Sequence, residues 1–206
     1  MEEYKHNVIK QYIKNNLNMT PDRQELLFKR VERSCQIQKA LKYQELESEG
    51  PGEEGRIWLS TEGMAHSYYY NKTKGTNCGT QIWKKNELML FSSSLSRGEY
   101  RNNYIQMLEP GTVLSMSYKE ILAIRGEFPE VASHLEHISN VNEQAFQHRI
   151  RLLNEASVQR IIQFEEENPL FCNIASVCTK AMHVGLTRQG YSLLKKKILE
   201  KRRGKG

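Results

Sequence analysis

The stretch from Ala181 to Ile198 constrains the fold most, because it predicts two short helices joined by a tight turn. Gly185 fits the turn, since glycine accepts a positive φ without a Cβ penalty. Thr187 can cap the second helix by accepting a backbone N–H on its hydroxyl. Apolar residues that can bury one face of this helix then recur at helical spacing: Leu186, Tyr191, Leu194 and Ile198. The arrangement is that of a helix-turn-helix, whose second helix enters the major groove of DNA.

The basic charge of the chain is concentrated in and after this second helix. Residues 186–206 hold eight Lys or Arg and one acid, a net charge of +7, whereas the whole chain carries +6 and residues 1–185 therefore carry −1. Such a segment is either a solvated basic tail or a contact with nucleic acid, and the helix-turn-helix beside it favours DNA. The basic residues are Arg188, Lys195, Lys196, Lys197, Lys201, Arg202, Arg203 and Lys205.

Composition and spacing exclude several other classes of protein. A hydrophobic fraction of 38% and a charged fraction of 26% predict a globular chain rather than a disordered one. No apolar run is long enough to span a membrane and the first residues lack the apolar core of a signal peptide, so we expect a cytoplasmic protein. The four cysteines form no CxxC pair, and no nucleophile–base pair, Walker loop or metal-ligand spacing occurs. We therefore expect no metal site and no enzyme.

The rest of the sequence predicts helices on either side of a β-rich region. Apolar spacing predicts helices over residues 4–17, from Thr20-Pro21 onward, and over 118–126, 156–167, 170–174 and 177–184. We expect Val158, Ile161, Ile162 and Phe164 to face inward in one of these helices, and Cys178, Ala181 and Val184 in another. Short strands separated by Gly-rich or Asn-rich turns predict an antiparallel sandwich or barrel, over Ala40–Leu46, Arg56–Ser60, Met64–Tyr70, Thr80–Trp83, Tyr104–Leu108 and Thr112–Ser117.

A long helix is expected from Phe128-Pro129-Glu130 to about Ala156, with an apolar residue every three to four positions. About 27 residues of helix would span roughly 40 Å. Such a helix either pairs with its copy in a dimer or packs on its own sheet. Asn142, His148 and Arg149 interrupt its apolar stripe.

Taken in order, these segments resemble the CRP/FNR family of bacterial transcription regulators, especially the small members common in Bacteroidetes. The resemblance covers nearly the whole chain and rests on Tyr104–Glu109, Val113–Tyr118, Phe128–Glu130 and Ala181–Ser192. It implies an α+β fold with an N-terminal antiparallel β-roll of the cyclic-nucleotide-binding type (1–127) and a dimerisation helix (128–156). A C-terminal helix-turn-helix domain (157–206) follows, with its winged helix reduced to a basic tail. It also implies a homodimer that binds a promoter operator in double-stranded DNA, with RNA polymerase as a further partner.

The resemblance also implies which residues contact DNA. Arg188 and Gln189 would read base edges: an Arg suits guanine, and a Gln in place of the family's usual Glu could prefer adenine. Thr187, Ser192 and Lys195 would hold phosphates. The full implied set is Thr187, Arg188, Gln189, Tyr191, Ser192, Lys195 and Lys196.

In members of the family that bind cyclic nucleotides, a Glu holds the ribose and an Arg followed by Ser or Thr holds the phosphate, as a charge-assisted clamp. Counting back from Ser117-Tyr118, these positions fall on Glu87 and on Arg101 with Asn102. Asn86 replaces the family's Gly, Asn102 replaces its Ser, and extra residues intervene. We therefore expect an effector other than cyclic AMP in the roll. Glu87 and Arg101 could instead be surface or ion-paired residues of a roll that binds something else or nothing.

The sequence thus predicts a sequence-specific, homodimeric transcription regulator. The alternative is a ligand-sensing regulatory module that acts through protein partners and whose DNA reader has decayed. Three features favour this alternative: Leu193 stands where the family often has an Arg, Gly190 lies inside the second helix, and the wing is short. A glycine inside a helix costs about 1 kcal/mol relative to alanine.

Overall fold

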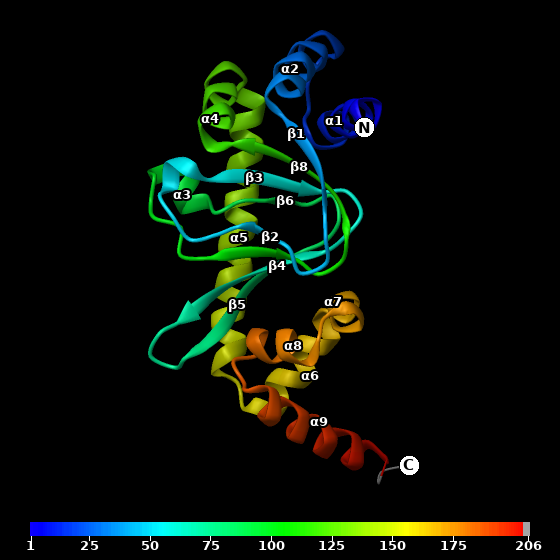
Figure 1. Cartoon of the computed structure of the whole chain (residues 1–206), viewed down its shortest axis with the longest axis vertical. Coiled ribbons are helices and arrows are strands. Elements are labelled where there is room, and N and C mark those ends of the chain that lie inside the picture. Colours follow the sequence, from blue (N-terminus) through cyan, green and yellow to red (C-terminus); the bar gives the residue numbers. More distant parts are fainter. Residues whose placement is uncertain (204–206) are drawn as a thin grey trace. The chain divides into compact units, whose positions relative to one another are not determined.

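The computed structural model describes the backbone of residues 1–203 and the side chains up to Lys201, so Lys205 of the predicted basic tail lies outside the described residues. The chain is α+β, with antiparallel strands, one long helix and a set of C-terminal helices (Figure 1). Its contacts form two units, which are described separately: Met1–Ala65 with Trp83–Glu143, and His66–Ile82 with Gln144 onward. The division into a roll, a dimerisation helix and a DNA-binding domain stays a prediction.

One antiparallel sheet of the first unit has the strand order β1-β8-β3-β6. Its register pairs Ile37 with Leu114 and Ile57 with Met116. The other sheet has the order β2-β7-β4-β5, and the pairing of β2 with β7 shifts between Glu45 and Glu47. The strands are β1 (Gln36–Ala40), β2 (Glu45–Glu47), β3 (Arg56–Ser60), β4 (Ala65–Asn71), β5 (Thr76–Trp83), β6 (Leu88–Met89), β7 (Tyr104–Met107) and β8 (Gly111–Ser117).

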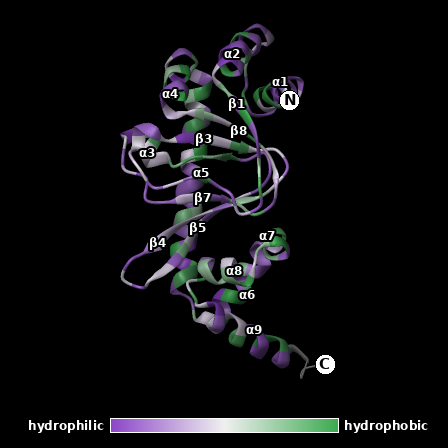
Figure 2. Cartoon of the chain, in the orientation of Figure 1, coloured by the Kyte–Doolittle hydropathy of each residue, from purple (hydrophilic) through white to green (hydrophobic). Residues whose placement is uncertain are grey.

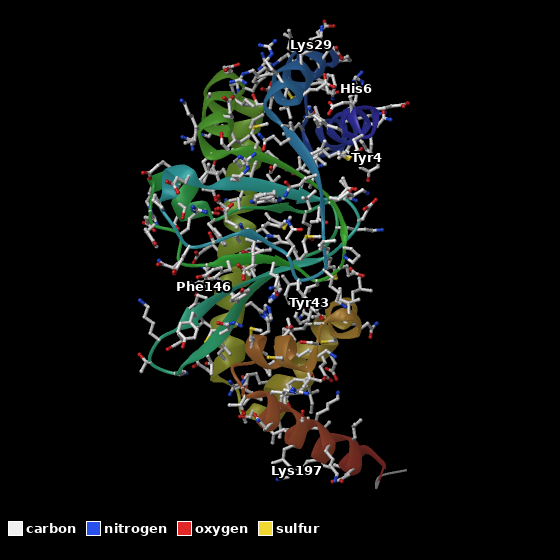
Figure 3. The ribbon with its side chains drawn as sticks, in the orientation of Figure 1. Tyr4, His6, Lys29, Tyr43, Phe146 and Lys197 are labelled. Carbon is white, nitrogen blue, oxygen red and sulfur yellow. The ribbon has the colours of Figure 1, made fainter. Side chains whose placement is uncertain are left out.

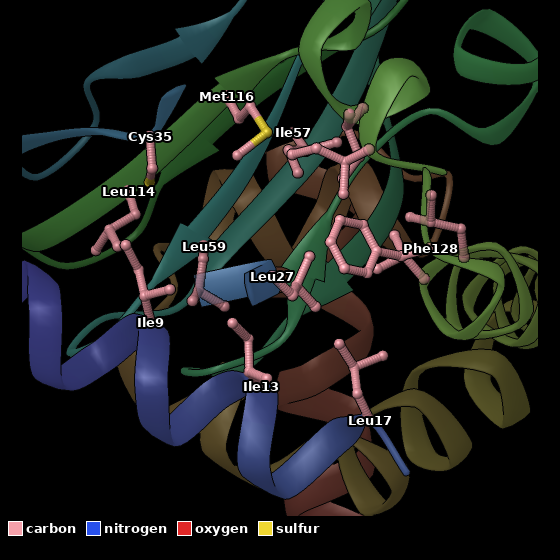
Figure 4. Close-up of a cluster of buried hydrophobic side chains, with 14 of the residues drawn as sticks. Ile9, Ile13, Leu17, Leu27, Cys35, Ile57, Leu59, Leu114, Met116 and Phe128 are labelled. Atoms are coloured by element: carbon pink, nitrogen blue, oxygen red, sulfur yellow. The ribbon is translucent and has the colours of Figure 1, made fainter. Parts of the chain in front are cut away.

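Strand β3 is buried on both faces, because its alternate side chains enter two different cores. Ile57 and Leu59 belong to a cluster with Ile9, Ile13 and other residues of the N-terminal helices, shown in Figure 4. Trp58, between them, belongs to a second cluster that includes Met89, Ile105 and Val113. The sequence of β3 is therefore a continuous apolar run and does not alternate as that of a half-exposed strand would.

The helices of the first unit are α1 (Glu2–Asn16), α2 (Pro21–Ser34), the short α3 (Ser92–Arg97), α4 (Tyr118–Glu127) and the start of α5 (Pro129–Asn154). A 3-10 turn covers Gly52–Glu54. Ser117 caps α4 by accepting the backbone N–H of Glu120. Pro21 stands at the first turn of α2, although Thr20 before it makes no side-chain capping bond.

The second unit contains most of the β4–β5 hairpin, the end of α5 and four further helices: α6 (Ser157–Glu167), α7 (Pro169–Ile174), α8 (Val177–His183) and α9 (Arg188–Arg203). Its buried side chains include Ile161, Phe164, Phe171, Ala181 and Val184. Helix α9 carries both hydrophobic and hydrophilic residues (Figure 2). Among the described residues, none of the helices is both long and apolar enough to span a membrane.

Several predictions about local structure were wrong. The expected strand Ala40–Leu46 is interrupted, because Leu41 is 72% exposed and the chain turns through Tyr43, whose φ is 65°, before β2 begins. Cys178 is exposed and Val158 is 42% exposed, so neither faces inward. Thr179, one residue further, takes the buried position in α8. Strand β6 and helix α3 were not predicted, since both are too short to show a period.

Candidate nucleic-acid interface

Two capped helices and one glycine form the helix-turn-helix. Ser176 begins α8 by accepting the backbone N–H of Thr179 at 3.1 Å. Gly185 ends it with a φ of 64°, as the sequence predicts. Two backbone bonds close the turn, from Leu186 to the carbonyl of Ala181 and from Gly185 to that of Met182. This pair of bonds is the Schellman motif, which requires a left-handed residue at this position.

The hydroxyl of Thr187 caps α9, accepting the backbone N–H of Gly190 at 3.1 Å. The predicted cap is therefore confirmed. Gly190 does not break the helix, which continues to Arg203. Helix α9 is thus intact at the position where the sequence suggested weakness.

Two arginines hold the carbonyl end of α8. Arg149 of α5 donates to the carbonyl of His183 at 2.7 Å, and Arg160 of α6 donates to that of Val184 at 2.9 Å. Positive charge at the C-terminal end of a helix interacts favourably with its dipole and satisfies carbonyls that lack a partner in the helix. The turn that leads into α9 is therefore fixed from both neighbouring helices.

The inner face of α9 is fixed by a carboxylate of α6. Tyr191 is 3% exposed and donates its hydroxyl hydrogen to Glu165. Lys195 forms an ion pair with the same carboxylate. Burial, and then the bond to Glu165, raise the pKa of Tyr191, so that the hydroxyl stays protonated. Ile198, also buried, continues this face one to two turns further along.

The opposite face of α9 is exposed. Arg188, Gln189, Ser192 and Lys196 are exposed on it, Thr187 is exposed just before the helix begins, and Lys197, labelled in Figure 3, extends the basic surface. Lys196 makes a long i,i+4 contact of 3.9 Å with Glu200. Five of the seven predicted DNA-contacting residues are therefore exposed on or just before this helix, whereas Tyr191 points inward and Lys195 is shared with Glu165.

The structure places the residues predicted for an effector site in different surroundings. Arg101 is 5% exposed and forms a buried ion pair with Glu47. Its guanidinium also donates to the carbonyls of Ser48 and Pro51, each at 3.0 Å. The Glu47 carboxylate in turn accepts the indole N–H of Trp58 at 2.8 Å. The positive charge of Arg101 is thus already neutralised within the protein.

Glu87 and Asn102 are exposed on the surface, whereas Arg101 is buried. Glu87 is exposed and accepts the backbone N–H of Lys84 at 2.8 Å, in a turn where Asn86 has a φ of 65°. Asn102 is exposed and donates to the carbonyl of Tyr100 at 3.4 Å. Arg101 is thus ion-paired within the protein, and its assignment to an effector site stays a prediction. Across the residues that the structure describes, no group of three or more metal-ligating side chains occurs.

Comparison with solved structures identifies the architecture. A protein described as a CRP/FNR-family transcriptional regulator from Eubacterium rectale aligns with a TM-score of 0.75 at 14% identity, over 93% of this chain and 88% of that one. The c-di-GMP-responsive regulator CLP of Xanthomonas campestris aligns with a TM-score of 0.71 at 11% identity, over 86% and 92%. FixK2 of Bradyrhizobium japonicum aligns with a TM-score of 0.66 at 15% identity, over 81% and 85%. No family model and no curated protein sequence matches. The chain has the CRP/FNR fold.

Sequence patterns did not identify three residues that support the CRP/FNR fold in this chain. Glu165 holds the inner face of α9, Glu47 neutralises Arg101, and Arg160 holds the turn. Glu165 lies in a run of acids, Glu165–Glu167, that reads as a solvated face. The apolar residue Phe164 beside it was the available signal, since it places Glu165 at the edge of the buried face.

We expect Tyr191→Phe to lower the free energy of unfolding by about 1–2 kcal/mol, because a partly buried hydrogen bond to a charged group is lost. Urea unfolding followed by circular dichroism measures this. Ser192→Ala, one residue along on the exposed face, is the matched control and should change stability little. Equal effects of the two changes would contradict the inward placement of Tyr191.

Proposed function

We propose that this protein is a homodimeric, sequence-specific DNA-binding regulator of transcription, and that α9 reads the major groove. The observation that carries the proposal is the division of α9 into two faces. Tyr191 and Ile198 are buried on one face, while Arg188, Gln189 and Lys196 are exposed on the other. Arginine and glutamine are the side chains that make bidentate contacts with guanine and adenine. A regulator of this kind works where the chromosome is, which implies a cytoplasmic location in a bacterium.

Exposed apolar residues on α5 support the dimer. Phe146 is 53% exposed and Ile150, one turn further on the same face, is 41% exposed; Figure 3 labels Phe146. Val141 is also 48% exposed on this helix. Large apolar side chains so placed are typical of a helix that packs against a partner. Two copies joined along α5 would present two copies of α9 to half-sites about one helical turn of DNA apart.

The effector of this regulator is proposed to be something other than cyclic AMP. The support is that the guanidinium of Arg101 is already ion-paired with Glu47 and donates hydrogen bonds to two backbone carbonyls. A phosphate at this position would have to displace a buried carboxylate. The module that acts only through protein partners is not favoured, because α9 is continuous and its polar face is exposed. RNA polymerase stays a predicted partner.

The first test is selection from random duplex DNA at physiological salt, followed by titration of the recovered sequence against a scrambled duplex. A palindrome preferred by about a hundredfold or more would support the proposal, since specific regulators exceed non-specific binding by at least that ratio. Recovery of no sequence above background, from protein that is folded and dimeric, would count against it.

Substitutions on the exposed face should separate base reading from phosphate binding. Arg188→Ala should remove about 1–3 kcal/mol of discrimination at one base pair, because a bidentate contact is lost. Lys196→Ala should instead weaken binding to all duplexes alike and lessen the salt dependence. Competition titrations with single-base operator variants measure both effects. A loss for Arg188→Ala that is the same on operator and scrambled DNA would refute its assignment as a base reader.

A further inference from the structure

A cavity of about 100 Å³ lies in the first unit, between the α1–α2 pair and one face of the β1-β8-β3-β6 sheet. Helix α1 contributes Ile9 and Ile13, helix α2 contributes Leu27 and Val31, and the sheet contributes Leu59 and Leu114. Figure 4 shows Ile9 and Ile13 extending from α1 toward the strands that carry Leu59 and Leu114. The cavity is separate from the Arg101–Glu47 pair, whose residues are not among those that line it.

The polar side chains at this cavity are already satisfied. The hydroxyl of Tyr12 and Nε2 of His134 are 2.9 Å apart and hydrogen-bonded to each other. The hydroxyl of Ser115 accepts from Arg56 at 3.0 Å. Burial raises the pKa of Tyr12, lowers that of His134 and raises that of Cys35 to about 11, so none of these three groups is charged near pH 7. A charged ligand would lose its hydration here without gaining a partner.

The size and lining of the cavity define what can enter it. Water needs two to four polar partners in a buried site, and an engineered apolar cavity of about 150 Å³ in another protein stays dry and binds benzene or xenon. We propose that the cavity under α1 and α2 is a binding site for a small, uncharged, apolar molecule about the size of one hydrocarbon ring. Filling it restores the dispersion contacts that its lining atoms lack.

Ion pairs hold α2, which covers one side of the cavity, against α4 and α5. Arg23 of α2 binds Glu130 of α5 through two bonds of 2.8 Å. Arg30 donates to Glu120 at 3.0 Å and to Glu127 at 3.3 Å, both on α4. The first turns of α5 also line the cavity, through Val131 and Leu135. The ligand therefore contacts the helix proposed to carry the dimer, which makes it a candidate effector. The binding itself is independent of the proposed function.

The test uses the full chain without DNA and benzene as the probe. Thermal unfolding should shift upward by about 3–6 °C when benzene reaches ten times its dissociation constant. Methyl NMR should place the shifts on Ile9, Ile13, Leu59 and Leu114, and leave Ile161 and Ile198 of the second unit unchanged. Benzoate, which has the same ring with a charge, should give neither effect. Absence of a shift with benzene, an equal response to benzoate, or shifts spread over both units would overturn the inference.

A matched pair of substitutions tests the location. Val31→Phe fills the cavity from α2 and should abolish the rise in Tm with benzene, while Val158→Phe, the same change at an exposed position of α6, should leave it intact. A benzene response that survives in folded Val31→Phe would overturn the site. If Val31→Phe does not fold, the methyl shifts of the unmodified protein decide the question alone.

Discussion

Replacing Arg101 with alanine is expected to lower the free energy of unfolding by about 3–5 kcal/mol, because it leaves the Glu47 carboxylate buried without its counter-charge. Glu47 is only 7% exposed, and the carbonyls of Ser48 and Pro51 would lose their donors as well. Breaking one partner of a buried pair costs far more than the pair contributes in total. Urea unfolding followed by tryptophan fluorescence measures the change, since Trp58 contacts Glu47 directly.

An exposed pair provides the control. Arg97 lies 2.6 Å from Glu99, but the two side chains are 67% and 50% exposed. Arg97→Ala should therefore change stability little, because water replaces the lost partner. In the Arg101→Ala background, Glu47→Gln should restore part of the stability, since an amide still accepts from Trp58 and carries no charge. Equal losses for Arg101→Ala and Arg97→Ala would contradict the buried pair.

The second unit is expected to lose stability in acid, because it buries a neutral histidine. His183 is 2% exposed, and its Nε2 lies 3.1 Å from Nδ1 of His66. Burial first, and then the nearby His66 and Arg149, lower its pKa well below 6.5. In the unfolded chain His183 therefore binds a proton near pH 6.5, whereas in the folded protein it stays neutral at that pH. Stability is complete above that pH and falls below it, by up to about 1.4 kcal/mol per pH unit.

Thermal unfolding between pH 7.5 and 5 tests this expectation. His183→Gln should make stability fall less steeply with decreasing pH, by the contribution of about one proton. His134 of the first unit also has a pKa lowered by burial, so some acid sensitivity should remain in His183→Gln. An unchanged pH dependence in His183→Gln would show that the imidazole is not kept neutral by the fold.

Local signals in the sequence were enough to predict the helix-turn-helix. Gly185 forms the left-handed turn and Thr187 caps the next helix. Both roles depend on residues within a few positions in the sequence, so local patterns reveal them. The strands of the roll were harder to place. Leu41 is apolar yet 72% exposed, so a pattern based on hydrophobicity placed a strand over the turn that separates β1 from β2.

Contacts between distant residues could not be predicted in this way. Glu165 is 26 residues from Tyr191 and 30 from Lys195, and Glu47 is separated from Arg101 by most of the roll. The sequence does not distinguish the carboxylates of a charged run from one another, because only the fold shows which of them contacts a buried side chain. The sequence therefore marked Arg101 as notable but left open whether its partner is a phosphate or an internal acid, whereas the structure pairs it with Glu47.

In the proposed complex with DNA, the carboxylate that holds the inner side of α9 would also change what Lys195 contributes. Association with a duplex is driven largely by the release of ions condensed on its phosphates, one for each cation that arrives free. Lys195 arrives bound to Glu165, so its approach to a phosphate would exchange one ion pair for another and set few ions free. In that complex Glu165 would compete with the phosphate backbone for Lys195, and the residues on the exposed face would supply the attraction.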